Sequence, residues 1–201
     1  AAFQITMIFS IFASSLSLML MPKLSRLFSK KDLSNSSRIL ETSVNYTLFL
    51  LFPLVIFLFL NSRAIVDFFF TDNFSDSTIL LQFLIVSAYI RSLSRPFLTQ
   101  LISLGNLNAS FIIGMFSTIT HLIFVAVLVP DSLFSLKMFN LGVFGVIFSS
   151  IISQTLTLFL GFYFSELNKL RIILIFSKQV SFSILIFFVL VHFGLESLTD
   201  V

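Results

Sequence analysis

The stretch TSVNYTLFLLFPLVIFLFL, residues 42–60, decides the fold class, because it is a long apolar run without a charged side chain. A helix needs roughly 20 apolar residues, at about 1.5 Å rise each, to cross the hydrocarbon core of a bilayer. The run therefore predicts a membrane-spanning helix. Pro53 lies inside it, and the missing backbone N–H of a proline predicts a kink there.

Similar apolar runs lie on both sides of this stretch and are separated by short polar breaks. The first run ends at Pro22, a Gly105-Asn106 turn divides two others, and Pro130 ends the fourth. The sequence thus predicts an all-α, polytopic membrane bundle, a single domain over residues 1–201 with about six spanning helices. We expect these helices at about residues 1–21, 42–60, 79–103, 109–129, 141–164 and 179–195.

The composition agrees with a membrane protein and excludes other classes. Hydrophobic residues make up 57% of the chain and charged residues only 10%, whereas soluble domains carry about 25% charged residues. The 12 Lys and Arg are scattered between apolar runs, so we expect no nucleic-acid partner. The chain has no Cys, which excludes disulfides and thiolate metal sites. It opens at Ala1 inside an apolar run, without the basic start of a signal peptide, which indicates a piece of a longer protein.

The distribution of basic residues predicts the orientation of the bundle. Residues 22–38 carry five of them against one acid, and residues 165–178 carry a second basic cluster. Residues 61–77 instead contain Asp67, Asp72 and Asp76 with only Arg63. By the positive-inside rule, loops 22–38 and 165–178 face the cytoplasm. We therefore expect the protein in the cytoplasmic membrane, which it crosses several times.

Arg91 and Arg95 are the first candidates for a binding site. They stand four residues apart in the predicted helix 79–103, hence on one face. A cation in mid-membrane usually faces a bundle interior or a wet cavity, and two guanidiniums predict an anionic substrate such as a pyrophosphate. The alternative is that Arg95 reaches the interface while Arg91 pairs with a carboxylate or carbonyl.

Other polar residues within the predicted helices are weaker candidates. They are Gln4, Asn45, Gln100, His121 and Gln154. Each of these side chains either lines a hydrophilic path for sugar hydroxyls or forms a hydrogen bond between helices. Gly142 and Gly145 are three residues apart and predict a close helix approach. We found no metal-spaced His/Asp/Glu cluster, no glycine-rich nucleotide loop and no carboxylate pair in a shared span, so we expect no enzyme, no cofactor and no metal site.

Several short motifs, in order along the chain, resemble the polysaccharide flippases of the multidrug/oligosaccharidyl-lipid/polysaccharide exporter superfamily, the O-antigen and teichoic-acid exporters related to the lipid II flippases. The resemblance is carried by MPKLSR at residues 21–26, Pro53, IVDFFFTDNF at residues 65–74, RSLSRP at residues 91–96, LGN at residues 104–106, Pro130, and LGVFGV at residues 141–146. Thr71-Asp72 stands where the family usually has Gly, and the Gly pair after Pro130 is delayed by an insertion.

The resemblance implies one lobe of a MATE-like transporter, about the C-terminal lobe, with a missing N-terminal lobe as partner. It implies a transporter that flips a polyprenyl-pyrophosphate-linked oligosaccharide or polysaccharide precursor by alternating access, with membrane lipid and the lipid-linked glycan as partners. Arg91 and Arg95 would then hold the pyrophosphate. The alternatives are a multidrug antiporter of the same superfamily, a membrane-embedded glycan polymerase or acyltransferase, and a non-transporting scaffold.

Overall fold

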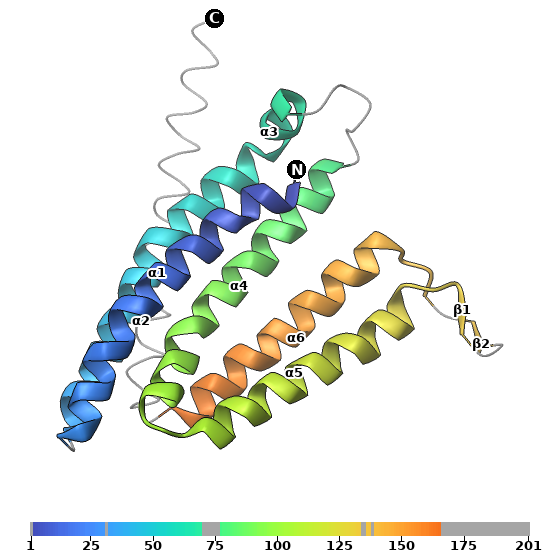
Figure 1. Ribbon diagram of the computed structural model, residues 1–201. Coiled ribbons are helices and arrows are strands. Elements are labelled where there is room, and N and C mark those ends of the chain that lie inside the picture. Colours follow the sequence, from blue (N-terminus) through green and yellow to red (C-terminus); the bar gives the residue numbers. More distant parts are fainter. Residues whose placement is uncertain (1, 31, 70–76, 134–135, 138, 166–201) are drawn as a thin grey trace, which may run out of the picture.

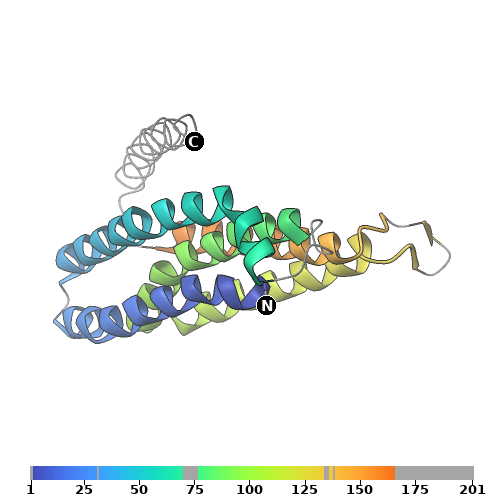
Figure 2. The same ribbon diagram turned by 90° about the horizontal axis from the view of Figure 1, so that it is seen from above.

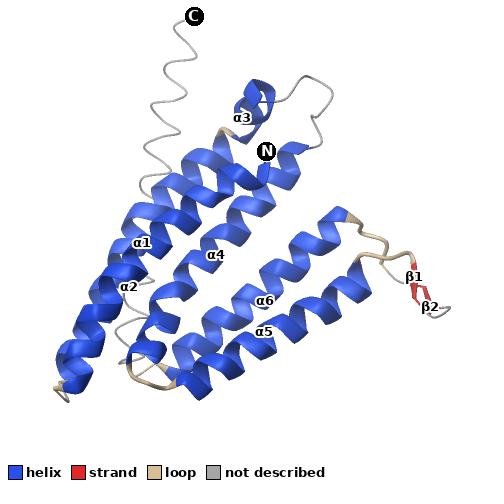
Figure 3. Cartoon of the chain, viewed as in Figure 1, coloured by secondary structure: helices blue, strands red, loops and turns tan. Residues whose placement is uncertain are grey.

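The structure is a computed structural model that describes residues 2–30, 32–69, 77–133, 136–137 and 139–165. Its elements are α1 (Ala2–Ser29), α2 (Leu33–Leu60), α3 (Ser62–Phe69), α4 (Ser77–Ser103), α5 (Leu107–Leu128), β1 (Ser132–Leu133), β2 (Leu136–Lys137) and α6 (Val143–Phe164). Figure 3 shows that most of the described chain is helix. The strands β1 and β2 form one small antiparallel hairpin. The all-α membrane class is confirmed.

Four of the described helices are long and apolar enough to cross a membrane: they contain the stretches Thr6–Ser29, Ser34–Leu60, Leu107–Leu128 and Val143–Phe164. Helix α4 is long enough at 27 residues, but it is the least apolar of the five long helices. The polar character of α4 marks it as the helix that faces other protein or a wet cavity. The sixth predicted span, residues 179–195, lies outside the described residues.

Helix α4 is the centre of the bundle. It packs against α1 and α2 on one side and against α6 on the other, and α5 in turn packs on α6 (Figure 1). One core cluster joins Phe9 of α1, Leu51 of α2 and Ile85 of α4. A second cluster joins α2 to α4 through residues that include Leu48 and Phe97. Seen from above, α1 and α2 spread apart from their turn with α4 between them (Figure 2).

Helices α1 and α2 are longer than the sequence predicted. Helix α1 does not end at residue 21 but continues through Pro22 to Ser29, and α2 begins at Leu33 rather than 42. The predicted loop 22–38 is thus almost wholly helical. Leu24 and Leu40 are both completely buried, and this burial at the end of the helix pair outweighs the hydrogen bond lost at Pro22.

The turn between α1 and α2 is fixed by a side-chain cap on α2. Asp32 is the N-cap: its Oδ1 accepts from the backbone N–H of Asn35 at 3.2 Å and from Ser34 Oγ at 3.0 Å, and its Oδ2 accepts from Asn35 Nδ2 at 2.6 Å. These bonds favour the carboxylate and lower the pKa of Asp32, with the Asn35 side chain as the largest cause. A charge-assisted cap of this kind stabilises the first turn of a helix.

The other predicted boundaries lie close to the observed ones. Helix α4 begins at Ser77, after the short α3, and ends at the predicted turn. In this turn Gly105 has a φ of +71°. The side chain of Asn106 then caps α5 by accepting a hydrogen bond from Ala109 N. Helices α5 and α6 then form a hairpin. The predicted close approach is present at Gly145, where a Cβ would meet the backbone of Leu128 at 2.9 Å, whereas Gly142 has no atom within 4 Å of such a Cβ.

Candidate functional site

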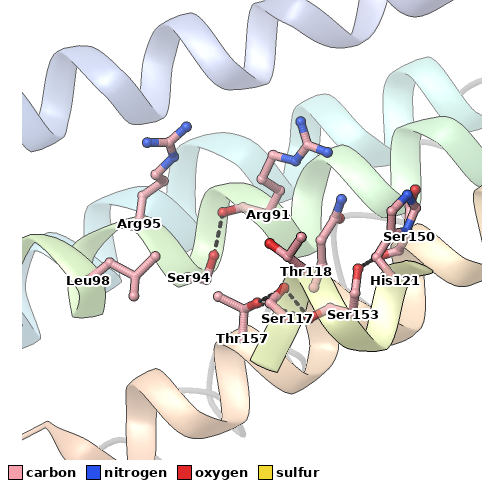
Figure 4. Close-up of a pocket in the computed structure, with 11 residues that line it drawn as sticks. Arg91, Ser94, Arg95, Leu98, Ser117, Thr118, His121, Ser150, Ser153 and Thr157 are labelled. Atoms are coloured by element: carbon pink, nitrogen blue, oxygen red, sulfur yellow. Dashed lines mark hydrogen bonds between the residues drawn. The ribbon is translucent and has the colours of Figure 1, made fainter. Parts of the chain in front are cut away.

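Arg91 and Arg95 lie one turn apart on α4, and both side chains are exposed. They line an open cavity of about 320 Å³ between α4, α5 and α6. In Figure 4 the two guanidinium groups point to the same side of α4. Their spacing predicted one shared face of α4, and the structure shows that face and places both residues at the same cavity.

Hydroxyl groups make up most of the rest of the cavity wall. The wall is formed by Ser94 and Leu98 of α4, Ser117, Thr118 and His121 of α5, and Ser150, Ser153, Gln154 and Thr157 of α6. None of the described lining residues is a carboxylate. The cavity thus offers positive charge and neutral hydrogen-bonding groups, a combination that suits an anion carrying hydroxyls.

Two of these hydroxyls join α5 to α6. Thr157 Oγ1 donates to Ser117 Oγ at 2.7 Å, and Ser117 Oγ donates to the Ser153 carbonyl at 3.2 Å (Figure 4). Between apolar helices such bonds hold the backbones in a fixed register. This pair is a structural support of the cavity wall.

Gln154 of α6 hydrogen-bonds to two residues of α4, Ser87 and Arg91. With its amide nitrogen toward Ser87, Gln154 donates to Ser87 Oγ at 3.0 Å, and its Oε1 accepts from Arg91 Nε at 3.2 Å and Nη2 at 2.9 Å. The opposite amide orientation keeps a bond from Ser87 Oγ to Oε1 at 3.0 Å, but turns the amide N–H groups toward the guanidinium, donor against donor. The first orientation satisfies every group. Gln154 thereby fixes the position of the Arg91 guanidinium without neutralising it.

Arg91 also borders a second cavity, of about 190 Å³, between α1, α4 and α6. This cavity includes Thr6 and Ser10 of α1 and shares Ser150 with the first. Arg91 is therefore accessible from both sides of the contact between α4 and α6. Arg91 is the charged residue that the two cavities share.

The weaker candidates from the sequence divide into two groups. His121 and Gln154 line the arginine cavity; His121 Nδ1 is buried and has no hydrogen-bond partner among the described residues. Asn45 and Gln100 do not line it. Asn45 is exposed on α2, and Gln100 is completely buried, with neither its amide nitrogen nor its oxygen paired within the described part of the chain. The side chain of Gln4 lies outside the described residues.

Sequence reasoning missed the hydroxyl groups of the wall, although a signal was present. Ser150, Ser153, Gln154 and Thr157 follow the spacing of one helix face, and so do Ser87, Arg91, Ser94 and Arg95. Polar residues at i, i+3, i+4 and i+7 in a spanning helix mark the face turned away from lipid.

The described residues contain no group of three or more His, Cys, Asp or Glu that could hold a metal ion.

The comparisons with known proteins agree with a transporter. A family model described as lipid II flippase MurJ matches residues 1–200. No curated protein and no solved structure matches the chain significantly. The match confirms the expectation of a flippase for a lipid-linked precursor within the exporter superfamily, but it supports the lipid II branch and gives no support to the polysaccharide branch indicated by the motifs. With nearly its whole length matched, a helical bundle and a cationic cavity, the chain belongs to the lipid II flippase MurJ family.

Proposed function

We propose that this protein moves a polyprenyl-pyrophosphate-linked glycan across the cytoplasmic membrane, and that Arg91 and Arg95 bind the pyrophosphate. The observation that carries the proposal is the presence of two exposed guanidiniums in one cavity whose described lining includes no carboxylate. Uncompensated cations inside a membrane protein cost several kcal/mol or more. A doubly charged diphosphate offsets that cost.

The geometry around the arginines suits such a substrate. A planar guanidinium can bind phosphate oxygens with two parallel hydrogen bonds, and Gln154 presents Arg91 in one orientation. The hydroxyls of Ser117, Thr118 and Ser150 surround the same space and match sugar hydroxyls in hydrogen-bonding capacity. The lipid tail would remain in the bilayer while the glycan crosses by alternating access of two lobes.

The family match favours lipid II over a polysaccharide precursor as the glycan, because the family is described by that substrate. A multidrug antiporter for cationic compounds would need an acidic group in the cavity, and the described lining has none.

We propose transport without an enzymatic step, since His121 is the only ordinary general base among the described lining residues and no carboxylate accompanies it. Loops 22–38 and 165–178 would face the cytoplasm; of the second loop, residues 166–178 lie outside the described chain.

The test is translocation of a fluorescent lipid-linked glycan in proteoliposomes that contain the full-length protein. Arg91→Ala and Arg95→Ala should each lower the initial rate at least about tenfold, as expected for the loss of a charge-assisted contact. Arg63→Ala is the matched control, because Arg63 is exposed on α3 and lies 4.0 Å from Asp67. Its rate should stay at the wild-type level.

The substrates and variants together distinguish the outcomes. Faster movement of lipid II than of a polyprenyl-pyrophosphate oligosaccharide would support the lipid II assignment, and the reverse order would favour the polysaccharide assignment. Wild-type rates in both arginine variants would contradict the proposed site while leaving the flippase intact. No movement in the wild type would contradict the flippase itself.

A further inference from the structure

A third cavity, with cations of its own, lies between α1 and α2. It has a volume of about 320 Å³ and lies between the C-terminal half of α1 and the N-terminal half of α2. Leu16, Met19, Leu20 and Ile39 give it an apolar lining, and Lys23 and Arg38 are the two cations beside them. None of its lining residues borders the cavity of Arg91 and Arg95.

The two cations lie at one end of the groove. Lys23 is seven residues before Lys30 and Arg38 is six residues after Asp32, so the antiparallel hairpin places both at a similar depth, about 10 Å from the turn. Leu16 on α1 and Tyr46 on α2 lie roughly 10–12 Å farther from the turn than these cations. The groove is therefore cationic at the end near the turn, and farther from the turn it is lined by apolar side chains of α1 and by the hydroxyl-bearing side chains of α2.

None of the residues that line the groove is a carboxylate. The side chains of Lys23 and Arg38 are both exposed. Hydroxyl groups of Thr42 and Ser43 border the same groove. Two exposed cations beside apolar side chains match the chemistry of a lipid phosphate with its acyl chain.

We propose that the groove between α1 and α2 binds an anionic phospholipid, with the phosphate between Lys23 and Arg38 and one acyl chain along Leu16, Leu20 and Ile39. Charge complementarity selects an anionic over a zwitterionic headgroup, and the apolar lining selects a lipid over a free phosphate. This site is separate from the proposed transport site, and its lipid holds α1 and α2 together at the end where only a short turn joins them.

These 201 residues contain no Trp, so a single Trp can serve as the reporter once any Trp elsewhere in the full-length protein has been replaced by Phe. In Tyr46→Trp the new indole stands at the apolar end of the groove, where Tyr46 is 63% exposed. The full-length protein is reconstituted in vesicles of phosphatidylcholine or of phosphatidylglycerol with brominated acyl chains, and quenching is compared. We expect the brominated phosphatidylglycerol to quench more strongly at equal mole fraction. Phe159→Trp on α6, at a position 66% exposed, is the control and should be quenched equally by both lipids.

Two sets of variants, each made in the Tyr46→Trp background, then test the assignment. Lys23→Ala and Arg38→Ala should each lower the preference for the anionic lipid about fivefold. Arg26→Ala with Lys30→Ala, which removes two positive charges outside the groove, should keep it. Thr42→Phe keeps the cations but fills the groove, and should abolish the preference that the indole reports. The Lys23 and Arg38 side chains are exposed, so their removal leaves the core intact.

The contrary outcomes are equally definite. Equal quenching by both lipids in Tyr46→Trp, or a preference that survives the loss of Lys23 and Arg38, would overturn the proposal. Equal losses in the Arg26 and Lys30 variant would indicate general surface attraction instead. If a polyprenyl-pyrophosphate glycan relieved the quenching at a small fraction of the phospholipid concentration, the groove would belong to the transported lipid. Translocation assays on the same variants separate this proposal from the flippase, since phospholipid binding does not require transport.

Discussion

A Cβ atom on Gly145 would lie 2.9 Å from both the carbonyl carbon and the carbonyl oxygen of Leu128, so the start of α6 meets the end of α5 backbone to backbone. The last turn of α5 is also held by the backbone bond from Leu141 N to Leu128 O at 2.9 Å. Neither side of this contact can yield as a flexible side chain would. The α5–α6 hairpin, and with it one wall of the arginine cavity, depends on the absence of a side chain at Gly145.

Gly145→Ala should therefore destabilise the protein by about 1–3 kcal/mol, the usual cost of overpacking. Gly114→Ala is the matched control, because a Cβ at Gly114 on α5 meets nothing within 4 Å and alanine favours the helix. Thermal unfolding in detergent measures both. A Gly145→Ala protein as stable as Gly114→Ala would show that the two helices can separate without cost.

The bond between Thr157 and Ser117 should contribute a measurable interhelical coupling. A double-mutant cycle with Thr157→Val and Ser117→Ala is expected to give about 0.6 kcal/mol, the average for hydrogen bonds between helices in a membrane. Thr118→Val is the control on α5, since among the described residues the Thr118 hydroxyl bonds to Gly114 O of its own helix and not to α6. A coupling of zero would assign the contact between α5 and α6 to packing alone.

Gln100 offers a stabilising substitution. Its amide is completely buried and has no partner among the described residues, and an unpaired buried amide costs about 1–3 kcal/mol. Gln100→Met should therefore raise the unfolding temperature. Gln82→Met on the same helix should lower it, because Gln82 donates to Ser62 Oγ at 3.0 Å. A fall in stability of Gln100→Met would reveal a partner for this amide.

These residues also show what the sequence could and could not predict. The turn at Gly105 and Asn106 was predictable, because its signals are local. The continuation of α1 through Pro22 was not, because the compensating burial of Leu24 and Leu40 comes from two different helices. Likewise the spacing of Arg91 and Arg95 is a property of one helix, whereas the rotation of each helix against its neighbours depends on packing.

The contrast between Gln100 and Gln154 makes the same point for the site. Both are glutamines in long helices, and residue type alone made them equal candidates. Gln154 belongs to a stripe of polar residues with Ser150 and Thr157 and lines the cavity, whereas Gln100 is buried away from it. The stripe was a usable signal, but only the packing of α4 against α6 shows that Gln154 contacts Arg91.

Asp32 should make the stability of the α1–α2 turn depend on pH. Its pKa in the folded protein lies below the ordinary value, because Asn35 and Ser34 hydrogen-bond to the carboxylate. A lowered folded pKa means a stabilising contribution that is complete above the unfolded pKa and lost as the pH falls through the folded pKa. Asp32→Asn keeps an N-cap acceptor but removes the titration. The difference in unfolding temperature between wild type and Asp32→Asn should shrink as the solution is acidified; a difference independent of pH would contradict the role of the charge.

Gln154 is expected to act as a positioning residue for Arg91. Its Oε1 accepts from two nitrogens of the guanidinium while its amide nitrogen is held by Ser87, so the arginine is oriented but keeps its full charge. If Arg91 binds the pyrophosphate, Gln154→Ala should raise the KM for the lipid-linked substrate up to about tenfold with little change in kcat, since the freed Arg91 side chain must be ordered by the substrate itself.

Gln154→Glu should impair transport more than Gln154→Ala, because a carboxylate at this position would pair with Arg91 and cancel the charge that the substrate needs. Thr155→Ala, a change at an exposed neighbour whose hydroxyl bonds within α6, should leave both constants unchanged. A merely structural role for Gln154 predicts a different order, with the hydrogen-bonding Glu better tolerated than Ala, so the ranking of these two variants in proteoliposomes decides between positioning and packing.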